Sequence, residues 1–254
     1  MNSPIVGRIR ASRACFLQLG LLLVLSMSGC KNPAPSATSA NTYAANGPAA
    51  TSEPYSDSRH ERQRSKRGRA ETQATPGEFD FYLLNLSWSP EFCATHSSST
   101  ECGRGLGFVV HGMWPQDITG DYPENCSDAP GPANPQAYTD IIPTASLVNH
   151  EWQVHGTCSG LQPDAYFAAI RTAYSKLKIP AGIGAGDDSS GVPPQQLLER
   201  FEKVNPGFPA GSIALSCGNN RLTAVEVCLT KDLHPESCQG VRSCRANVVK
   251  VTPP

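Results

Sequence analysis

The chain has 254 residues and a formal net charge of −1, with 39% hydrophobic and 17% charged residues. This length accommodates one domain of about 150–200 residues with additional segments. Ten Lys or Arg stand against four Asp or Glu up to Pro76, whereas from Gly77 onward there are 11 basic and 18 acidic residues. This balance excludes a broad basic field on the body, so a polyanion would have to bind locally, in a cleft.

The first 30 residues are typical of an export signal. Arginines precede the apolar run 15–24, which is too short to predict a membrane span. The run leads into LSMSGC, which resembles a bacterial lipoprotein cleavage box; in such proteins the cysteine, here Cys30, becomes the lipidated first residue. By the same resemblance, Lys31 favours the outer membrane. We expect a bacterial periplasmic protein anchored to that membrane, or alternatively a soluble periplasmic or secreted protein with a plain signal peptide.

Residues 31–77 are predicted to form a disordered tether. They are rich in Ala, Ser, Thr, Pro and Asn, and they carry too few large apolar side chains to offset the entropy lost on ordering. The basic run 59–69 within the tether is explained by solvated linker charge, and contact with anionic lipid or RNA is the alternative. The folded domain is placed at residues 78–254.

The folded domain begins with two predicted strands. Aromatic and aliphatic residues over 79–88 predict a buried strand, and residues 107–111 predict a second strand that turns at Gly112 and Pro115. The next segment, 117–143, is rich in Pro, Asp and Gly and predicts a long loop.

The rest of the domain mixes helices and strands. Helices are predicted over 145–155, 164–178 and 193–203, each bounded by Gly, Pro or Asn. In the second helix Asp164 is the expected cap, and one face is expected to be buried by Tyr166, Ile170, Ala173 and Leu177. Strands are predicted over 211–217, 222–229 and 246–251. Strands flanking a helical middle, without regular βα alternation, predict an α+β fold with a central, mainly antiparallel sheet and packed helices.

Eight cysteines lie outside the export signal: Cys93, Cys102, Cys126, Cys158, Cys217, Cys228, Cys238 and Cys244. An even number in an exported domain predicts disulfides, although eight cysteines allow 105 pairings. No paired CxxC spacing is present, so metal-bound cysteines are not expected. The domain is therefore predicted to be stapled by disulfides.

Two short segments hold three of the six histidines. FVVHGMWPQ carries His111, and HEWQVHGTC carries His150, Glu151 and His155. On a helix, Glu151 and His155 share a face and can touch, and a carboxylate orients an imidazole and favours its protonated form. Two positioned histidines can cleave RNA without a metal, because RNA supplies its own nucleophile, the 2′-hydroxyl.

A zinc site and purely structural roles are the alternatives. The zinc-protease motif His-Glu-x-x-His places two histidines four residues apart, whereas His150 and His155 are five apart and diverge, so no metal is expected. A single histidine such as His111, or an aromatic residue such as Trp114, is more often part of a core when considered alone. The joint occurrence of both segments favours a catalytic site.

Together the two segments resemble the active-site signatures of the ribonuclease T2 family, HGLWP and EWxKHGTC. LSWSPEFC at residues 86–93 resembles the family's first strand and its cysteine, and NPG at 205–207 and the strand 224–228 also have counterparts. The resemblance covers most of residues 79–251.

The resemblance implies a metal-independent endoribonuclease, without cofactor, that cleaves single-stranded RNA by transphosphorylation. His155 would act as the general base on the 2′-hydroxyl, and His111 would protonate the departing 5′-oxygen. His150 would bond the phosphate, while Glu151 would support His155 and the charge developing on phosphorus. The product would be a 2′,3′-cyclic phosphate, hydrolysed afterwards to a 3′-phosphate.

The resemblance also predicts substrate contacts. Trp114 and Tyr122 match positions where family members stack a base, and Gln116 stands where some members carry an Asp that reads a base edge. Val154 replaces a Lys that supplies a cation to the phosphate, and such a loss typically costs about 10²–10³-fold in rate. The alternative function is therefore a catalytically weak relative that binds RNA or a protein through the same cleft.

The same resemblance implies disulfides that pair residues 93–102, 126–158, 217–244 and 228–238. The second bridge would tie the long loop to the catalytic helix. Apart from RNA and the membrane, no obligatory partner is expected, and the protein is predicted to be a monomer.

Overall fold

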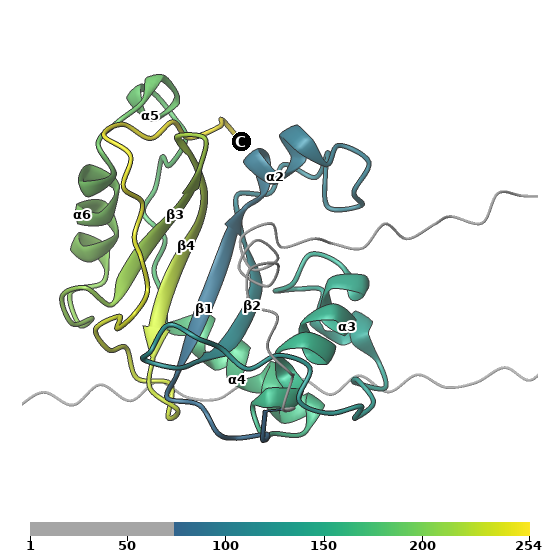
Figure 1. Ribbon diagram of the computed structural model, residues 1–254. Coiled ribbons are helices and arrows are strands. Elements are labelled where there is room, and N and C mark those ends of the chain that lie inside the picture. Colours follow the sequence, from purple (N-terminus) through teal and green to yellow (C-terminus); the bar gives the residue numbers. More distant parts are fainter. Residues whose placement is uncertain (1–73) are drawn as a thin grey trace, which may run out of the picture. The chain divides into compact units, whose positions relative to one another are not determined.

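The computed structural model describes residues 74–254 (Figure 1). The predicted export signal, the lipidation site at Cys30, the basic run 59–69 and the tether up to residue 73 lie outside the described residues. In the described part of the chain, no helix is both long enough and apolar enough to cross a membrane.

A four-stranded antiparallel sheet forms the centre of the fold, in the order β2-β1-β4-β3. Its strands are β1 (Phe81–Trp88), β2 (Phe108–Gln116), β3 (Ile213–Gly218) and β4 (Arg221–Leu229). Its helices are α2 (Ser89–Thr95), α3 (Ala145–Val154), α4 (Pro163–Lys176), α5 (Asp187–Ser190) and α6 (Pro194–Val204), with 3-10 turns η1 (Pro135–Tyr138) and η2 (Gly156–Cys158). Helix α3 contacts β2 and α6 contacts β3, at opposite edges of the sheet (Figure 1). The α+β prediction is confirmed.

Strand β1 is the central element and is buried on both faces. Tyr82, Leu84, Leu86 and Trp88 point into the main core, which α4 and α6 complete. Successive side chains of a strand alternate between faces, so the other face carries Phe81 and Leu83, which pack in a smaller cluster with Trp114 and Cys228. Asn85 and Ser87 continue this second face, which is the one that carries the site.

Strand β2 is longer than the sequence predicts. The predicted turn at Gly112 and Pro115 is wrong, because β2 continues to Gln116, paired with β1. The strand lies at the edge of the sheet, where a proline is tolerated. A bulge interrupts the register: Asn85 pairs with Gly112 and Leu86 with Val110, so His111 is the extra residue.

Helix α4 buries the face that the sequence predicts: Tyr166, Ile170 and Ala173 are buried, and Leu177, which caps the end of the helix, is buried as well. The predicted cap is wrong, since Gln162 occupies that position and Pro163 opens the first turn. Asp164 instead accepts a hydrogen bond of 2.5 Å from the hydroxyl of Tyr138.

Residues 246–251 do not form the predicted strand. The segment pairs with the body through isolated bridges, from Val249 to Val192 and from Lys250 to Arg221, and Val249 and Val251 are buried in the main core. The unpredicted helices are the short α2 and α5, which follow β1 and precede α6.

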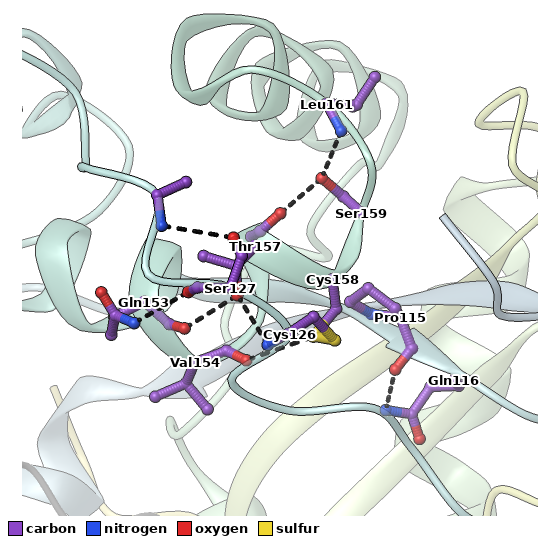
Figure 2. The surroundings of a disulfide bond; sticks show 12 residues. Pro115, Gln116, Cys126, Ser127, Gln153, Val154, Thr157, Cys158, Ser159 and Leu161 are labelled. Atoms are coloured by element: carbon purple, nitrogen blue, oxygen red, sulfur yellow. Dashed lines mark hydrogen bonds between the residues drawn. A yellow bond between two sulfur atoms is a disulfide. The ribbon is translucent and has the colours of Figure 1, made fainter. Parts of the chain in front are cut away.

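Four disulfides staple the domain, with the pairings that the resemblance implies: Cys93–Cys102, Cys126–Cys158, Cys217–Cys244 and Cys228–Cys238. Around Cys126–Cys158, hydrogen bonds join the long loop to the end of α3 (Figure 2). The Thr157 hydroxyl accepts from the Cys126 amide at 3.2 Å and donates to the Gln153 carbonyl at 3.0 Å. This end of α3 is therefore fixed by covalent and polar contacts together.

Candidate active site

His111 occupies the bulge of β2 and is 6% exposed. The Ser87 hydroxyl lies 3.0 Å from its Nδ1, and Glu151 Oε1 lies 3.2 Å from its Nε2. The Ser87 hydroxyl can accept from a protonated Nδ1 or donate to a bare one, so it pairs with either form of the ring. The Glu151 carboxylate favours the imidazolium form of His111.

Glu151 lies on α3 and is fully buried. Its Oε1 faces His111, and its Oε2 accepts a hydrogen bond of 2.8 Å from the indole nitrogen of Trp114. The carboxylate can approach β2 this closely because Gly112 has no side chain: a Cβ there would lie 1.8 Å from Oε2. A buried carboxylate needs a charged partner, and His111 supplies one.

Trp114 lies between His111, which belongs to β2, and His155, which follows α3. Its ring centroid lies 5.4 Å from that of His111, nearly perpendicular, and 5.2 Å from that of His155. The indole is only 2% exposed. It therefore serves as a buried spacer between the two imidazoles.

His155 caps the C-terminal end of α3. Its backbone N–H donates to the carbonyl of Glu151 at 3.0 Å, and its side chain is 3% exposed. The chain then passes so close to Trp152 that a Cβ on Gly156 would lie 2.5 Å from that ring. The helix end, this close packing and the disulfide at Cys158 together fix the position of His155.

The remaining predicted residues surround this cluster. His150 precedes Glu151 on α3 and is half-buried, as is Val154, whose carbonyl accepts from the Asn125 amide at 2.8 Å. Gln116 ends β2 beside the Cys126–Cys158 bridge and donates to the Pro115 carbonyl at 2.9 Å (Figure 2). Tyr122 is half-buried in the loop that follows.

The spacing in the sequence predicts that Glu151 contacts His155; in the structure its carboxylate oxygens also lie against His111 and Trp114. Ser87 was not predicted to belong to the site. The sequence did contain a signal: Asn85 and Ser87 are polar residues in the otherwise apolar strand FYLLNLSW. Residues two apart in a strand point to the same face, so both lie on the face of Leu83.

Glu101 is a second buried carboxyl near the site that the sequence analysis missed. It is 3% exposed and accepts a hydrogen bond of 2.9 Å from the Ser89 hydroxyl. Burial raises the pKa of Glu101, and the Ser89 bond and the charge of His111 act in the opposite direction. No local pattern marks this residue, because it lies in a loop beside Cys102.

Tyr166 supports the site from α4. Its hydroxyl donates to the Met113 carbonyl at 2.8 Å. Burial raises the pKa of Tyr166 well above its ordinary value, and the negative charge of Glu151 acts in the same direction. The tyrosine therefore stays neutral beside the carboxylate.

Within residues 74–254, no group of three or more His, Cys, Asp or Glu side chains is arranged to hold a metal ion. The cluster offers one imidazole between a hydroxyl and a carboxylate, and a second imidazole on the other side of an indole. This arrangement suits transfer of protons at two separate atoms of a substrate.

Comparison with known proteins identifies the family to which the domain is similar. The profile described as the Ribonuclease T2 family matches residues 79–238. A ribonuclease of Aeromonas hydrophila is 46% identical over 109 residues, which are 42% of this chain and 50% of that protein. A probable ribonuclease of Haemophilus influenzae is 36% identical over 121 residues, 40% of this chain and 44% of that protein. The chain thus spans about half the length of these bacterial relatives.

Solved structures show the same fold. Ribonuclease MC1 from bitter gourd seeds superposes with a TM-score of 0.55 at 22% identity, covering 68% of this chain and 100% of that chain. RNase NT, described in complex with 5′-AMP, superposes with a TM-score of 0.54 at 21% identity, covering 69% of this chain and 99% of that chain.

Proposed function

The chain belongs to the ribonuclease T2 family, and from this premise we propose that it is an endoribonuclease that cleaves single-stranded RNA by transphosphorylation to 2′,3′-cyclic phosphate ends. The family match spans both histidine segments, and the fold brings those segments together through Trp114. A structural neighbour's complex with 5′-AMP supports a nucleotide-like substrate.

The observation that carries this proposal is the placement of His111 between Ser87 and Glu151. Because the Glu151 carboxylate favours the imidazolium and the Ser87 hydroxyl is compatible with it, His111 enters the reaction with a proton to give. It therefore acts as the general acid, protonating the 5′-oxygen as the P–O bond breaks. The nearby Glu151 carboxylate stabilises the charge of the imidazolium until the proton passes to the leaving oxygen.

His155 acts as the general base. It takes the proton from the 2′-hydroxyl, whose oxygen then forms a bond to phosphorus as the 5′-oxygen leaves. The base comes from the end of α3 and the acid from β2, so the two can serve opposite sides of an in-line displacement. The half-buried His150 is assigned to the phosphate oxygens.

Val154 predicts a slow enzyme rather than an inactive one. It lies where the family pattern places a Lys, and an aliphatic side chain gives the phosphate no charge stabilisation. The acid–base pair does not depend on that position. Base stacking by Trp114 and Tyr122, and recognition of a base edge by Gln116, stay predictions.

We also propose export and anchoring through a lipid on Cys30, with the domain on the periplasmic side of the outer membrane. The four disulfides agree with an oxidising compartment. The mass of the mature N-terminus tests this: a lipid-modified Cys30 supports it, and an unmodified N-terminus or retention of residues 1–29 refutes it.

The test of function is incubation of the purified chain with single-stranded RNA in excess EDTA, followed by analysis of the ends. We expect 2′,3′-cyclic phosphates, and we expect His111→Ala and His155→Ala to abolish their formation. His234→Ala is the matched control, since His234 lies outside the cluster in the loop after β4. RNA binding without cleavage would establish the alternative, a binding module, and activity lost to EDTA would refute metal independence.

A further inference from the structure

Each carboxylate oxygen of Glu151 has a different neighbour, and only one of the two neighbours is a histidine. Oε1 faces Nε2 of His111 at 3.2 Å, while Oε2 accepts the indole N–H of Trp114 at 2.8 Å. The carboxylate is 0% exposed and the indole 2% exposed. Because solvent cannot replace it, the indole hydrogen bond sets the direction of the second oxygen.

A hydrogen bond from a neutral donor to a carboxylate has two effects. It favours the ionised form of the acid, and it restricts rotation of the carboxylate plane. In this site rotation would turn Oε1 away from the imidazole, because both oxygens belong to one rigid group. The indole N–H of Trp114 thus determines whether Glu151 Oε1 faces His111 Nε2.

We propose that Trp114 is a positioning residue: its indole N–H holds the Glu151 carboxylate in the orientation that keeps His111 protonated. The role assigned to His111 rests on the proposed function. This role differs from base stacking, which would use the face of the ring and not its nitrogen.

Other groups face His111, and they are unchanged when only the indole nitrogen is removed. Ser87 faces it from β1, and Glu101 acts on it from the loop after α2. His155 lies across the indole, and the neutral Tyr166 is bonded to the Met113 carbonyl. Trp114→Phe also changes the ring that lies against His111, with centroids 5.4 Å apart, so a shift in the His111 titration is assigned to Glu151 only if it disappears when Glu151 is replaced by Gln.

Trp152→Phe is a matched control for the loss of the indole in Trp114→Phe. Trp152 is also 2% exposed, lies on the same helix as Glu151, and donates its N–H to the Ala129 carbonyl at 2.9 Å. Trp152→Phe removes the same ring volume and the same kind of donor, but it leaves the carboxylate of Glu151 untouched. Trp114→Phe removes the donor to Glu151 and keeps an aromatic face.

The titration midpoint of His111 is measured by NMR, with its resonance assigned by its loss in His111→Ala. We expect Trp114→Phe to lower this midpoint by about one pH unit, the scale of one hydrogen bond to a charged group. Trp152→Phe should leave it unchanged. An unchanged midpoint in Trp114→Phe, or equal shifts in both variants, overturns the proposal.

A coupling test separates positioning from a general packing effect. Glu151→Gln removes the charge that Trp114 orients, so Trp114→Phe should not lower the His111 midpoint further in that background. An equal shift with and without the Glu151 charge overturns the proposal. In the unmutated protein, the indole N–H resonance of Trp114 should follow the His111 titration while that of Trp152 stays constant. This measurement requires no variant to fold, and a constant Trp114 resonance also overturns the proposal.

Kinetics provide the functional readout. Trp114→Phe should lower kcat about tenfold at a pH above the shifted midpoint and leave KM unchanged. A raised KM with an unchanged midpoint would instead indicate contact with a base and would overturn the positioning role. If the unmutated chain does not cleave RNA, the proposed function fails, whereas the NMR titrations still decide the role of Trp114.

Discussion

Gly112→Ala is the substitution most directly opposed by the structure. The added Cβ would lie 1.8 Å from Glu151 Oε2, 2.6 Å from its Cδ and 2.7 Å from the indole nitrogen of Trp114. These atoms belong to a buried carboxylate and a buried ring, so no exposed side chain can move aside. The methyl group must displace Glu151 and break its hydrogen bond with Trp114.

The expected loss has two parts. Overpacking of a filled site costs about 1–3 kcal/mol, and a hydrogen bond to a charged group contributes about 1.5–3 kcal/mol. We therefore expect Gly112→Ala to lower the free energy of unfolding by about 3–5 kcal/mol. Cleavage should fall at least about 100-fold, because the contact between the carboxylate and His111 is lost with it.

Denaturant unfolding and the RNA cleavage assay measure both effects, with Gly107→Ala as the control. A Cβ on Gly107 would meet only the ring of Trp88, at 3.4 Å, and this glycine has no positive φ. We expect Gly107→Ala to change stability by less than about 1 kcal/mol. If Gly112→Ala matches the control in stability and activity, the close approach of Glu151 to β2 is refuted.

Three further predictions follow from the contacts of the domain. Val154→Lys should raise kcat by about 10–100-fold through charge stabilisation of the phosphate, and an unchanged turnover would contradict the missing-cation argument. Replacing Cys126 and Cys158 by Ala should lower the free energy of unfolding by about 2–4 kcal/mol, measured by denaturant, because the bridge closes a loop of 32 residues. The pKa of Glu101 is raised above its ordinary 4.5 in the folded state, so the folded state binds this proton more tightly and stability declines as pH rises through that range. Glu101→Gln should therefore gain stability relative to the unmutated protein as the pH rises above 4.5, and a difference that does not change with pH would argue against the shift.

The local chemistry of α4 and the two histidine segments was predictable from sequence. The apolar spacing of Tyr166, Ile170 and Ala173 gave the buried face of α4, because helical periodicity is a short-range property. The segments around His111 and His155 were predicted to lie together, because few histidines occur and both segments resemble one family, and the structure brings them to either side of Trp114.

The partner of Glu151 was not predictable in the same way. Its spacing from His155 indicated a contact along one helix, but the carboxylate faces His111 on another element. That contact depends on β2 continuing through Gly112 and on a bulge against β1, and both are set by pairing between strands. The periodicity of one segment does not show how its residues pair with a distant strand. For the same reason the contact between Ser87 and His111 could not be predicted.

The central position of β1 has a consequence for how the protein is made. One edge of β1 pairs with β2, which follows closely, but its other edge pairs with β4, and the Asn85–Glu226 hydrogen bond joins residues 141 positions apart. Synthesis proceeds from the N-terminus, so a growing chain holds Ser87 and His111 long before it has the strand that completes the sheet. Until β4 emerges, the inner strand β1 presents an open edge, the kind of surface that promotes pairing with another chain. Completion of the sheet therefore waits for its last strand, and the cluster around His111 is assembled on a finished sheet only when nearly the whole polypeptide is available.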